Sequence, residues 1–587
     1  MVATQVPTPS PASSPGEMPY SVSHNASQAL DHLLQISSSE MPIDFGRYVR
    51  DVAFEARSAT GDSAIFPCPL RQQEACAALK ALEGCAVSAI AALSGPGKEN
   101  RRRITVDLER VVCYLMSAYV TTLDGLDKSN PKISRRLPNT DIHGAQSILY
   151  RRLSAGLYQT REPGRYYHVH GSLEASTTLR MIGLPPFVPG LTDYRECIKT
   201  IETAVQQFSV EQLDLLNVSL RQAGVPALTQ EQYLQTPHGS IMSSLPPFTV
   251  SPLELSTPPV PLGQEMDDKG RIQCLRGIRV IELCRVIAGP TIGRSLAAHG
   301  ASVLKVTSPH LPDVPFFQLD VNAGKHTASL NLKNPADRAT FDNLLATADV
   351  IVDGYRPGVT ARLGYSPEEL AAKAAQRGRG IVYVAEDCFG GSGIAGAEWA
   401  GRPGWQQIAD CVTGVAWEQG TFMGLDEPVV PPFPMSDYGT GTLGTIAALS
   451  GIYRRATEGG SWICRTSLSQ YNLFLLSLGL YPADVQAELR RRHDPEFFEL
   501  RHSDSVDVVG KCALRSIRRL HPGLFADNLM QSAYSIGFGG VVKWPKEALG
   551  VQGLGIGHVR ATRPNGFDAP AWEDWEEDET LLDVDLS

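Results

Sequence analysis

Short apolar runs alternate with helical stretches through the middle of the chain. The runs are rich in Val, Ile and Leu, and the stretches between them carry apolar residues at helical spacing. The apolar runs lie at residues 278–283, 301–306, 349–353 and 380–384. Short strands that are separated by single helices predict a parallel, doubly wound α/β sheet of the Rossmann-like kind. We therefore expect an α/β fold for this region.

Ligands of such sheets bind beyond the carboxyl ends of the strands. The loops that follow three of the predicted strands lie at residues 284–290, 307–325 and 354–362. No G-x-G-x-x-G fingerprint follows the first strand, so a dinucleotide-dependent dehydrogenase is not expected. The chain also lacks a P-loop after a strand and a G-x-S-x-G elbow, which argues against a P-loop nucleotidase and an α/β-hydrolase.

The regions that flank this sheet differ in composition. We expect a disordered Pro- and Ser-rich tail (residues 1–28), a mostly helical segment (29–236) and a Pro- and Ser-rich linker (237–270). The α/β domain (271–482) follows, and then a C-terminal segment that ends in an acidic tail (483–587).

Composition excludes several classes of function. The 587 residues are 43% hydrophobic and 20% charged, as in ordinary globular proteins, and the net charge of -10 argues against nucleic-acid binding. No apolar run is long enough for a membrane span, and the N-terminus lacks the features of a signal peptide, so we expect a cytoplasmic protein. The 11 cysteines form no C-x-x-C pair, and His168 and His170 have no third ligand nearby, so no metal is expected.

Asp437 is the candidate for chemistry. It lies among small residues and glycines, before the apolar run 443–449, which predicts a loop that enters a helix. A carboxylate there is at the positive end of the helix dipole, and its ordinary pKa of about 3.9 would leave it ionised at neutral pH. A helix cap and a reactive carboxylate are both compatible with these residues.

Residues 74–108 echo residues 443–468. Each segment has an Ala- or Leu-rich helix, a Gly-containing turn and a short strand. Residues 70–73 (L-R-Q-Q) take the place of the sequence around Asp437, so the upstream copy is expected to have no acid there.

An ordered series of motifs resembles the class III CoA-transferases (the CaiB/BaiF family), which include formyl-CoA transferase and α-methylacyl-CoA racemase. The resemblance covers residues 275–475. Its motifs are L-R-G-I-R-V-I-E-L with V-I-A-G-P (275–290), A-S-V-L-K-V (301–306), N-A-G-K to L-N-L-K (322–333), Y-R-P-G with R-L-G (355–364), F-G-G-S-G (389–393) and S-D-x-x-T-G (436–441).

The resemblance implies an enzyme that transfers a sulfur-containing group, with coenzyme A as co-substrate and a carboxylic acid as acceptor. It implies that Asp437 attacks the thioester carbonyl and passes through an aspartyl mixed anhydride and an aspartyl-CoA thioester. Backbone N–H groups at Gly390 and Gly391 would meet the developing oxyanion. By position, the residues implied to line the CoA site are Val286, Ala288, Leu330, Lys333, Tyr355, Val359 and Arg362, with Lys333 and Arg362 for phosphates.

Other functions stay open. Trp405 occupies the place of the histidine that serves as a base in the family's racemases. The absence of this base makes an acyl-CoA epimerase, racemase or dehydratase the less favoured alternative. Thr307 and Ser308 stand where the family has a phosphate contact, so a CoA-binding pseudoenzyme or scaffold is the alternative of another class. The upstream region is similar to the family's smaller α+β domain. Its position before the α/β half suggests either a homodimer or an intrachain pseudo-dimer.

Overall fold

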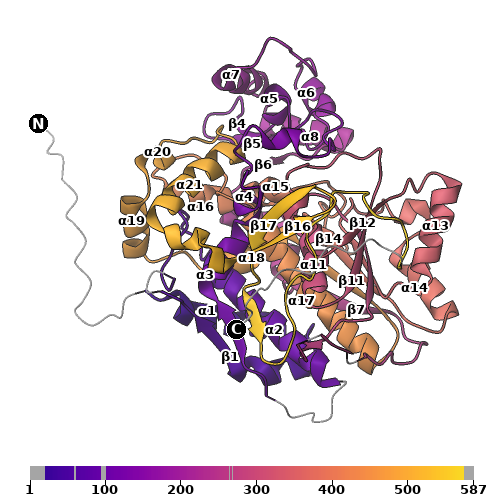
Figure 1. Ribbon diagram of the computed structural model, residues 1–587. Helices are drawn as coiled ribbons and strands as arrows, with labels where there is room; N and C mark the ends of the chain where they lie inside the picture. Colours follow the sequence, from indigo (N-terminus) through magenta and orange to yellow (C-terminus); the bar gives the residue numbers. More distant parts are fainter. Residues whose placement is uncertain (1–19, 59–60, 94–100, 264, 268, 574–587) are drawn as a thin grey trace, which may run out of the picture.

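A seven-stranded sheet forms the centre of the protein (Figure 1). The computed structural model describes residues 20–58, 61–93, 101–263, 265–267 and 269–573. The strand order is β12-β11-β10-β13-β14-β15-β7, in which all pairings are parallel except that of β7. The strands are β7 (Phe248–Glu254), β10 (Arg279–Leu283), β11 (Ser302–Thr307), β12 (His326–Ser329), β13 (Val350–Asp353), β14 (Val382–Asp387) and β15 (Ser461–Ser467). The predicted doubly wound α/β sheet is confirmed.

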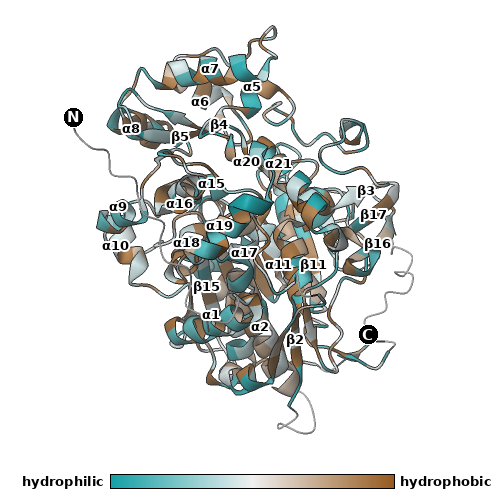
Figure 2. Ribbon diagram, turned by 90° about the vertical axis from the view of Figure 1, so that its left-hand side faces the viewer, coloured by the Kyte–Doolittle hydropathy of each residue, from teal (hydrophilic) through white to brown (hydrophobic). Residues whose placement is uncertain are grey.

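The apolar strands are buried on both faces because helices cover both. Successive side chains of a strand point to opposite faces, so Val280 and Val352 pack on one side and Ile281 and Ile351 on the other. The first face is covered by α11 (Ala288–Ala298) and α17 (Met435–Thr457), and the second by α13 (Pro335–Leu345) and α14 (Pro367–Gln376). In Figure 2, α11 and β11 are hydrophobic, whereas the outer helix α19 (Ala483–Arg492) is hydrophilic.

The upstream region adds a second, smaller sheet to this core. In it β2 (Ile104–Asp107) pairs in parallel with β1 (Val52–Glu55) and antiparallel with β18 (Leu549–Val551). Helix α2 (Gln72–Leu93) packs against both α1 (Val22–Ile36) and α17. Of the helices described, α2 alone has the length and hydropathy of a membrane span, but 89% of its apolar window is buried inside the protein.

A small domain lies apart from the main body, at the top of Figure 1, and has its own hydrophobic core. It contains α5 (Leu149–Arg152), β4 (Ala155–Gln159), β5 (Tyr166–His170), α6 (Ser176–Met181), α7 (Tyr194–Val205), α8 (Val210–Leu220) and β6 (Val225–Pro226). The expected smaller α+β domain is therefore present.

The predicted domain boundaries differ from the structure. Helix α1 begins at Val22, inside the predicted tail, because the hydroxyl of Ser21 caps its first turn by accepting from the His24 N–H. The predicted linker contains α10 (Pro237–Ser243) and the edge strand β7, where Pro252 is tolerated because that edge needs no donor.

The predicted C-terminal segment is also folded as far as residue 573. It contributes β18 to the small sheet, and the other elements are α19, α20 (Pro495–Phe498), α21 (Val506–Leu520), β16 (Met530–Ser535) and β17 (Gly540–Pro545). Most of the acidic run lies outside the described residues. Trp572, at its start, donates its indole N–H to the Leu344 carbonyl at 3.1 Å.

The remaining elements complete the core and the connections. They are α3 (Leu108–Leu115), α4 (Ser117–Val120), β3 (Thr122–Leu123), α9 (Gln230–Gln235), β8 (Glu265–Met266), β9 (Ile272–Gln273), α12 (Gln318–Val321), α15 (Gln406–Thr413), α16 (Val415–Phe422) and α18 (Leu468–Ser477). Short 3-10 turns join several of them.

His502 joins the small domain to the main body. Its Nε2 lies 2.7 Å from Glu202 of α7, and its Nδ1 lies 3.0 Å from Glu427, which precedes α17. Burial lowers the pKa of His502, but hydrogen bonds to both glutamates and their charges outweigh it and raise this pKa to about 9.

The His502 contact makes stability depend on pH. Because the folded pKa is raised above the unfolded value of about 6.5, the stabilisation is complete below about pH 6.5 and is lost as pH rises through about 9. We expect urea denaturation to show that the wild type loses stability over this range relative to His502→Gln. An unfolding free-energy difference between the two proteins that stays constant over this range would contradict the prediction.

Candidate active site

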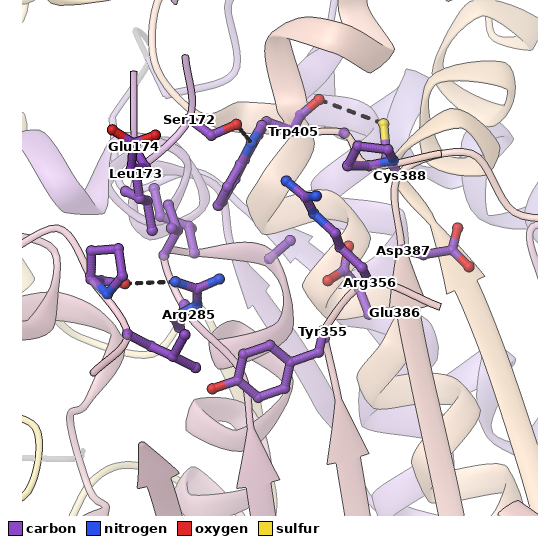
Figure 3. A pocket seen from close by; sticks show the side chains of 18 of the residues that line it. Ser172, Leu173, Glu174, Arg285, Tyr355, Arg356, Glu386, Asp387, Cys388 and Trp405 are labelled. Carbon is purple, nitrogen blue, oxygen red and sulfur yellow. Dashed lines mark hydrogen bonds between the residues drawn. The ribbon is translucent and has the colours of Figure 1, made fainter. Parts of the chain in front are cut away.

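A cavity of about 330 Å³ opens beyond the carboxyl ends of β10, β13 and β14. The strand order reverses between β10 and β13, and ligands of doubly wound sheets bind at such a point. From the other side the cavity is closed by Ser172, Leu173 and Glu174 of the small domain (Figure 3). Both the upstream and the downstream half of the chain therefore contribute to one site.

Asp437 lines this cavity as the third residue of α17. The helix begins two residues earlier, and its N-cap residue, Pro434, makes no side-chain hydrogen bond. Asp437 is only 9% exposed, and its carboxyl accepts no hydrogen bond from any residue within the described part of the chain. Asp437 is thus not the cap of the helix, and its carboxyl is left for a ligand.

The surroundings of Asp437 change its acidity. Burial, followed by the charge of Asp410, raises the pKa of Asp437 well above its ordinary value. Asp410 accepts hydrogen bonds from Ser436 at 2.9 Å and from Asn472 at 3.0 Å, and burial raises its own pKa to about 6. The sequence-based expectation of an unperturbed, fully ionised Asp437 is therefore wrong for the ligand-free cavity, where burial and the charge of Asp410 both oppose ionisation.

A second cavity, of about 80 Å³, also touches Asp437. Its walls include the apolar or aromatic side chains of Ile287, Phe317 and Phe433 and the charged side chains of Lys128 and Arg152. The carboxyl of Asp437 is thus shared by a larger and a smaller cavity, both of which have mixed apolar and charged walls. Such an arrangement suits a ligand that extends on both sides of the reacting atom, with its longer part in the larger cavity.

The structure brings only part of the predicted CoA site together. Val286, Ala288 and Tyr355 line the large cavity with Asp437, whereas Leu330, Lys333, Val359 and Arg362 do not. Leu330 is buried in the core beneath α13 and α14, and Lys333 and Arg362 are exposed on the surface. The positions assigned to phosphate binding from the motifs are therefore not at this cavity.

Two arginines that the motif comparison did not single out line the cavity instead. The guanidinium of Arg285 donates to the Pro312 carbonyl at 2.7 Å and lies 5.4 Å from the ring centre of Tyr355. Arg356 donates to the Arg221 carbonyl at 3.1 Å. Within the described residues neither arginine pairs with a carboxylate. Both arginines lie in loops that follow predicted strands, at residues 284–290 and 354–362. This position is the sequence signal by which they could have been found.

Gly390 and Gly391 lie behind the cavity and do not line it. The Gly390 N–H is occupied, since it donates to the Asp387 carboxylate at 2.5 Å. A Cβ at Gly390 would lie 2.4 Å from the Met242 methyl of α10, and both glycines have positive φ, 74° and 77°. These glycines allow the loop to turn tightly against α10, so the expected contact of their N–H groups with an oxyanion is not supported by their position.

Trp405 separates the two cavities and lines both. Its indole N–H donates to the hydroxyl of Ser172 at 2.8 Å, and its ring stacks on His170 at 5.8 Å. Burial lowers the pKa of both His168 and His170, so each is neutral. The described residues contain no group of three side chains placed to hold a metal ion.

The near-repeat has a counterpart of Asp437 after all. Glu74 is the third residue of α2, as Asp437 is of α17, and each helix is followed by a strand whose last residue caps the next helix. The Glu74 carboxyl is fully buried and accepts hydrogen bonds from Tyr20 at 2.6 Å and Tyr481 at 3.0 Å. The expectation that the upstream copy has no acid is wrong, because α2 begins at Gln72, two residues before the expected start of the repeat, which places Glu74 in the register of Asp437. The Glu74 carboxyl is enclosed by these contacts, whereas the carboxyl of Asp437 faces a cavity.

Comparison with known proteins identifies the family of this chain. A model of CoA-transferase family III matches residues 275–497. An acetyl-coenzyme A transferase from Hypoxylon pulicicidum is 32% identical over 91% of this chain and 90% of that protein. An acyl-CoA transferase from Gibberella moniliformis is 30% identical over 87% of this chain and 92% of that protein. A crystal structure of a CaiB/BaiF family protein from Brucella suis is 25% identical over 34% of this chain and 55% of that one, with a TM-score of 0.29.

These matches differ in how much of the chain they cover. The family model covers residues 275–497, whereas the two transferases match nearly the whole length of the chain. The similarity to these two proteins thus extends beyond the motifs of the α/β domain to the upstream region and the C-terminal segment. The chain is a member of CoA-transferase family III.

Proposed function

We propose that this CoA-transferase moves CoA from an acyl-CoA thioester to a carboxylic acid through covalent intermediates on Asp437. The observation that carries the proposal is the position of the Asp437 carboxyl. It is buried, it has no hydrogen-bond partner among the described residues, and it is shared by two cavities of different size.

The chemistry follows from the reactivity of a carboxylate towards a thioester. An oxygen of ionised Asp437 attacks the thioester carbonyl carbon, the new C–O bond forms, and the C–S bond breaks as CoA leaves with the electron pair. The thiolate then attacks the aspartyl carbonyl of the mixed anhydride, which releases the first acid and leaves an aspartyl-CoA thioester. The acceptor carboxylate repeats these steps in reverse order and leaves as the new thioester.

The two cavities divide the substrate. We assign the nucleotide and pantetheine portions of CoA to the large cavity, where Val286, Ala288 and Tyr355 provide apolar contacts and Arg285 and Arg356 provide positive charge. Guanidinium groups that have no carboxylate partner suit phosphate oxygens, which they can contact with two N–H groups at once. The acyl group and the acceptor acid fit the smaller cavity beside Phe317 and Phe433.

The assignment of phosphate contacts can be tested by comparing arginines inside and outside the cavity. We expect Arg285→Ala and Arg356→Ala each to raise KM for acetyl-CoA by about 10-fold, because each removes a charge-assisted hydrogen bond to a phosphate. Steady-state kinetics should show a much smaller change in kcat. An S-acetyl thioester of N-acetylcysteamine, which has no phosphates, should show no such increase in KM.

Lys333→Ala and Arg362→Ala are the matched controls, since both remove an exposed charge that lies off the cavity. We expect both to leave KM for acetyl-CoA within about twofold of the wild type, as for surface charges in general. A large increase in these controls, with none in the cavity variants, would return the phosphate site to the positions that the motifs implied.

An exchange assay tests the reaction class. With acetyl-CoA and isotopically labelled acetate, the proposal predicts that label enters acetyl-CoA without net hydrolysis. Label that never enters acetyl-CoA while CoA binds would favour a CoA-binding pseudoenzyme. Deuterium that enters the acyl α-carbon from solvent, with no exchange of acetate, would favour an epimerase.

A further inference from the structure

Glu386 is a second carboxyl in the large cavity. It lies near the carboxyl end of β14 and is 8% exposed. Within the described residues its side chain makes no hydrogen bond and no ion pair. A polar group that is buried without a partner costs free energy, so such groups in native proteins are usually kept for a bound ligand or for reaction chemistry.

Two glycines leave space for this carboxyl and for the Cys284 thiol beside it. A Cβ at Gly289, in the first turn of α11, or at Gly354, just after β13, would lie 3.3 Å from the Glu386 Oε2 and closer still, 2.7 or 3.0 Å, to the Cys284 Sγ. The carboxyl is therefore inserted between the two loops that meet at the reversal of the strand order. Figure 3 shows Glu386 turned towards the middle of the cavity, whereas the neighbouring Asp387 turns to the other side.

The charged groups that act on Glu386 are all acidic. They are Asp387 on its own strand, Asp437 of α17 and Asp353 of β13, with the Cys284 thiol also close. Burial, then these three carboxylates, raise the pKa of Glu386 well above its ordinary value. Asp353 is stabilised by hydrogen bonds from Tyr383 and Thr360, and Asp387 by the Gly390 N–H, whereas Glu386 has no such partner. When Asp437 ionises to attack, its charge further opposes ionisation of Glu386, so in the attacking state Glu386 is the neutral acid that can donate a hydrogen bond.

The reaction on Asp437 needs a donor of this kind. As the thioester carbonyl carbon becomes tetrahedral, negative charge develops on its oxygen, and fixed donors at that oxygen lower the barrier. The N–H groups of Gly390 and Gly391 lie behind the cavity. An ionised Glu386 would repel the developing charge, but a carboxylic acid that an apolar site keeps neutral can stabilise it.

We propose that Glu386 is a catalytic residue whose carboxyl O–H donates a hydrogen bond to the thioester carbonyl oxygen during attack by Asp437. The inference rests on the proposed function of Asp437. The carbonyl π electrons move to the oxygen that accepts the hydrogen bond, and no proton is transferred. When the carbonyl re-forms, the C–S bond breaks and CoA leaves with the electron pair, so Glu386 ends the step in the same protonation state.

Three variants test the role of Glu386. Glu386→Ala removes the donor, Glu386→Gln replaces the O–H with an amide N–H of similar size, and Glu418→Gln alters a half-buried carboxyl that lies outside both cavities. The measurement is the single-turnover rate of CoA release from saturating acetyl-CoA, followed with a thiol reagent. Thermal melting of each variant reports whether it is folded.

We expect Glu386→Ala to be slower than the wild type by about 10²–10³-fold, the usual effect of losing an oxyanion donor. Glu386→Gln should stay within about 10-fold of the wild type, because an amide still donates. Glu418→Gln should match the wild type. As pH rises, the wild-type rate should fall when Glu386 ionises, and Glu386→Gln should lack that fall.

Two results would overturn the proposal. One is a Glu386→Ala variant as fast as the wild type, and the other is a Glu386→Gln variant as slow as Glu386→Ala. If Glu386→Ala does not fold, the pH dependence of the other two proteins decides. The same fall in rate at high pH in the wild type and in Glu386→Gln would contradict the proposal. Failure of the wild type to form any adduct at Asp437 would instead refute the proposed function itself.

Discussion

Asp437→Asn is expected to lower kcat for CoA transfer by at least about 10⁴-fold, the scale of loss when a covalent nucleophile is removed. The amide has nearly the size of the carboxyl, so both cavities keep their shape, but its oxygen is a far weaker nucleophile. Binding of CoA should be retained, because the residues assigned to CoA lie elsewhere along the cavity. Exchange kinetics and calorimetric titration with CoA measure the two effects.

The same substitution should not destabilise the fold. The Asp437 carboxyl has no hydrogen-bond partner among the described residues, and burial together with Asp410 opposes its charge, so a neutral amide removes no native contact. We expect the melting temperature of Asp437→Asn to equal or exceed that of the wild type. An unfolded variant would show that the loss of activity has another cause, and an active folded variant would exclude Asp437 as the nucleophile.

Asp320→Ala should cause the largest loss of stability. Asp320 and Arg294 are both fully buried and lie 2.7 Å apart, and the Tyr438 hydroxyl donates to the other Asp320 oxygen at 2.6 Å. Removing the carboxylate leaves the guanidinium buried without its partner, which typically costs about 3–5 kcal/mol of unfolding free energy. Urea denaturation measures this loss.

The loss of stability in Asp320→Ala should extend to the active site. Tyr438 follows Asp437 directly, and its hydrogen bond to Asp320 joins the start of α17 to α12. Tyr438→Phe is the milder comparison, with an expected loss of about 1–3 kcal/mol, since it removes a hydroxyl and leaves the ion pair intact. Equal losses in Tyr438→Phe and Asp320→Ala would show that the ion pair itself contributes little.

The sequence predicted the sheet well because its strands are buried on both faces. Predominantly apolar runs such as 278–283 and 380–384 predict buried strands, and the helices between them indicate a parallel arrangement. The prediction failed at β7, whose single apolar face and Pro252 resemble a loop. Only its pairing with β15, more than 200 residues away, makes this segment a strand.

The site could be predicted only in part. Asp437, Val286, Ala288 and Tyr355 were found because local motifs specify them, and they do line one cavity. Glu386 was missed, because an acid at the end of an apolar strand has no local signal. Its significance comes from the missing partner and from the space left by Gly289 and Gly354, which are properties of the folded chain.

Trapping of the covalent intermediate tests the central claim most directly. The wild type and Asp437→Asn would each be incubated with acetyl-CoA and then with hydroxylamine, which converts an activated aspartyl group into a hydroxamate. Peptide mass spectrometry would locate the product. The mechanism predicts a hydroxamate at Asp437 in the wild type and none at residue 437 of the variant. A wild-type protein that exchanges CoA while Asp437 stays unmodified, or that is modified at another carboxyl, would contradict it.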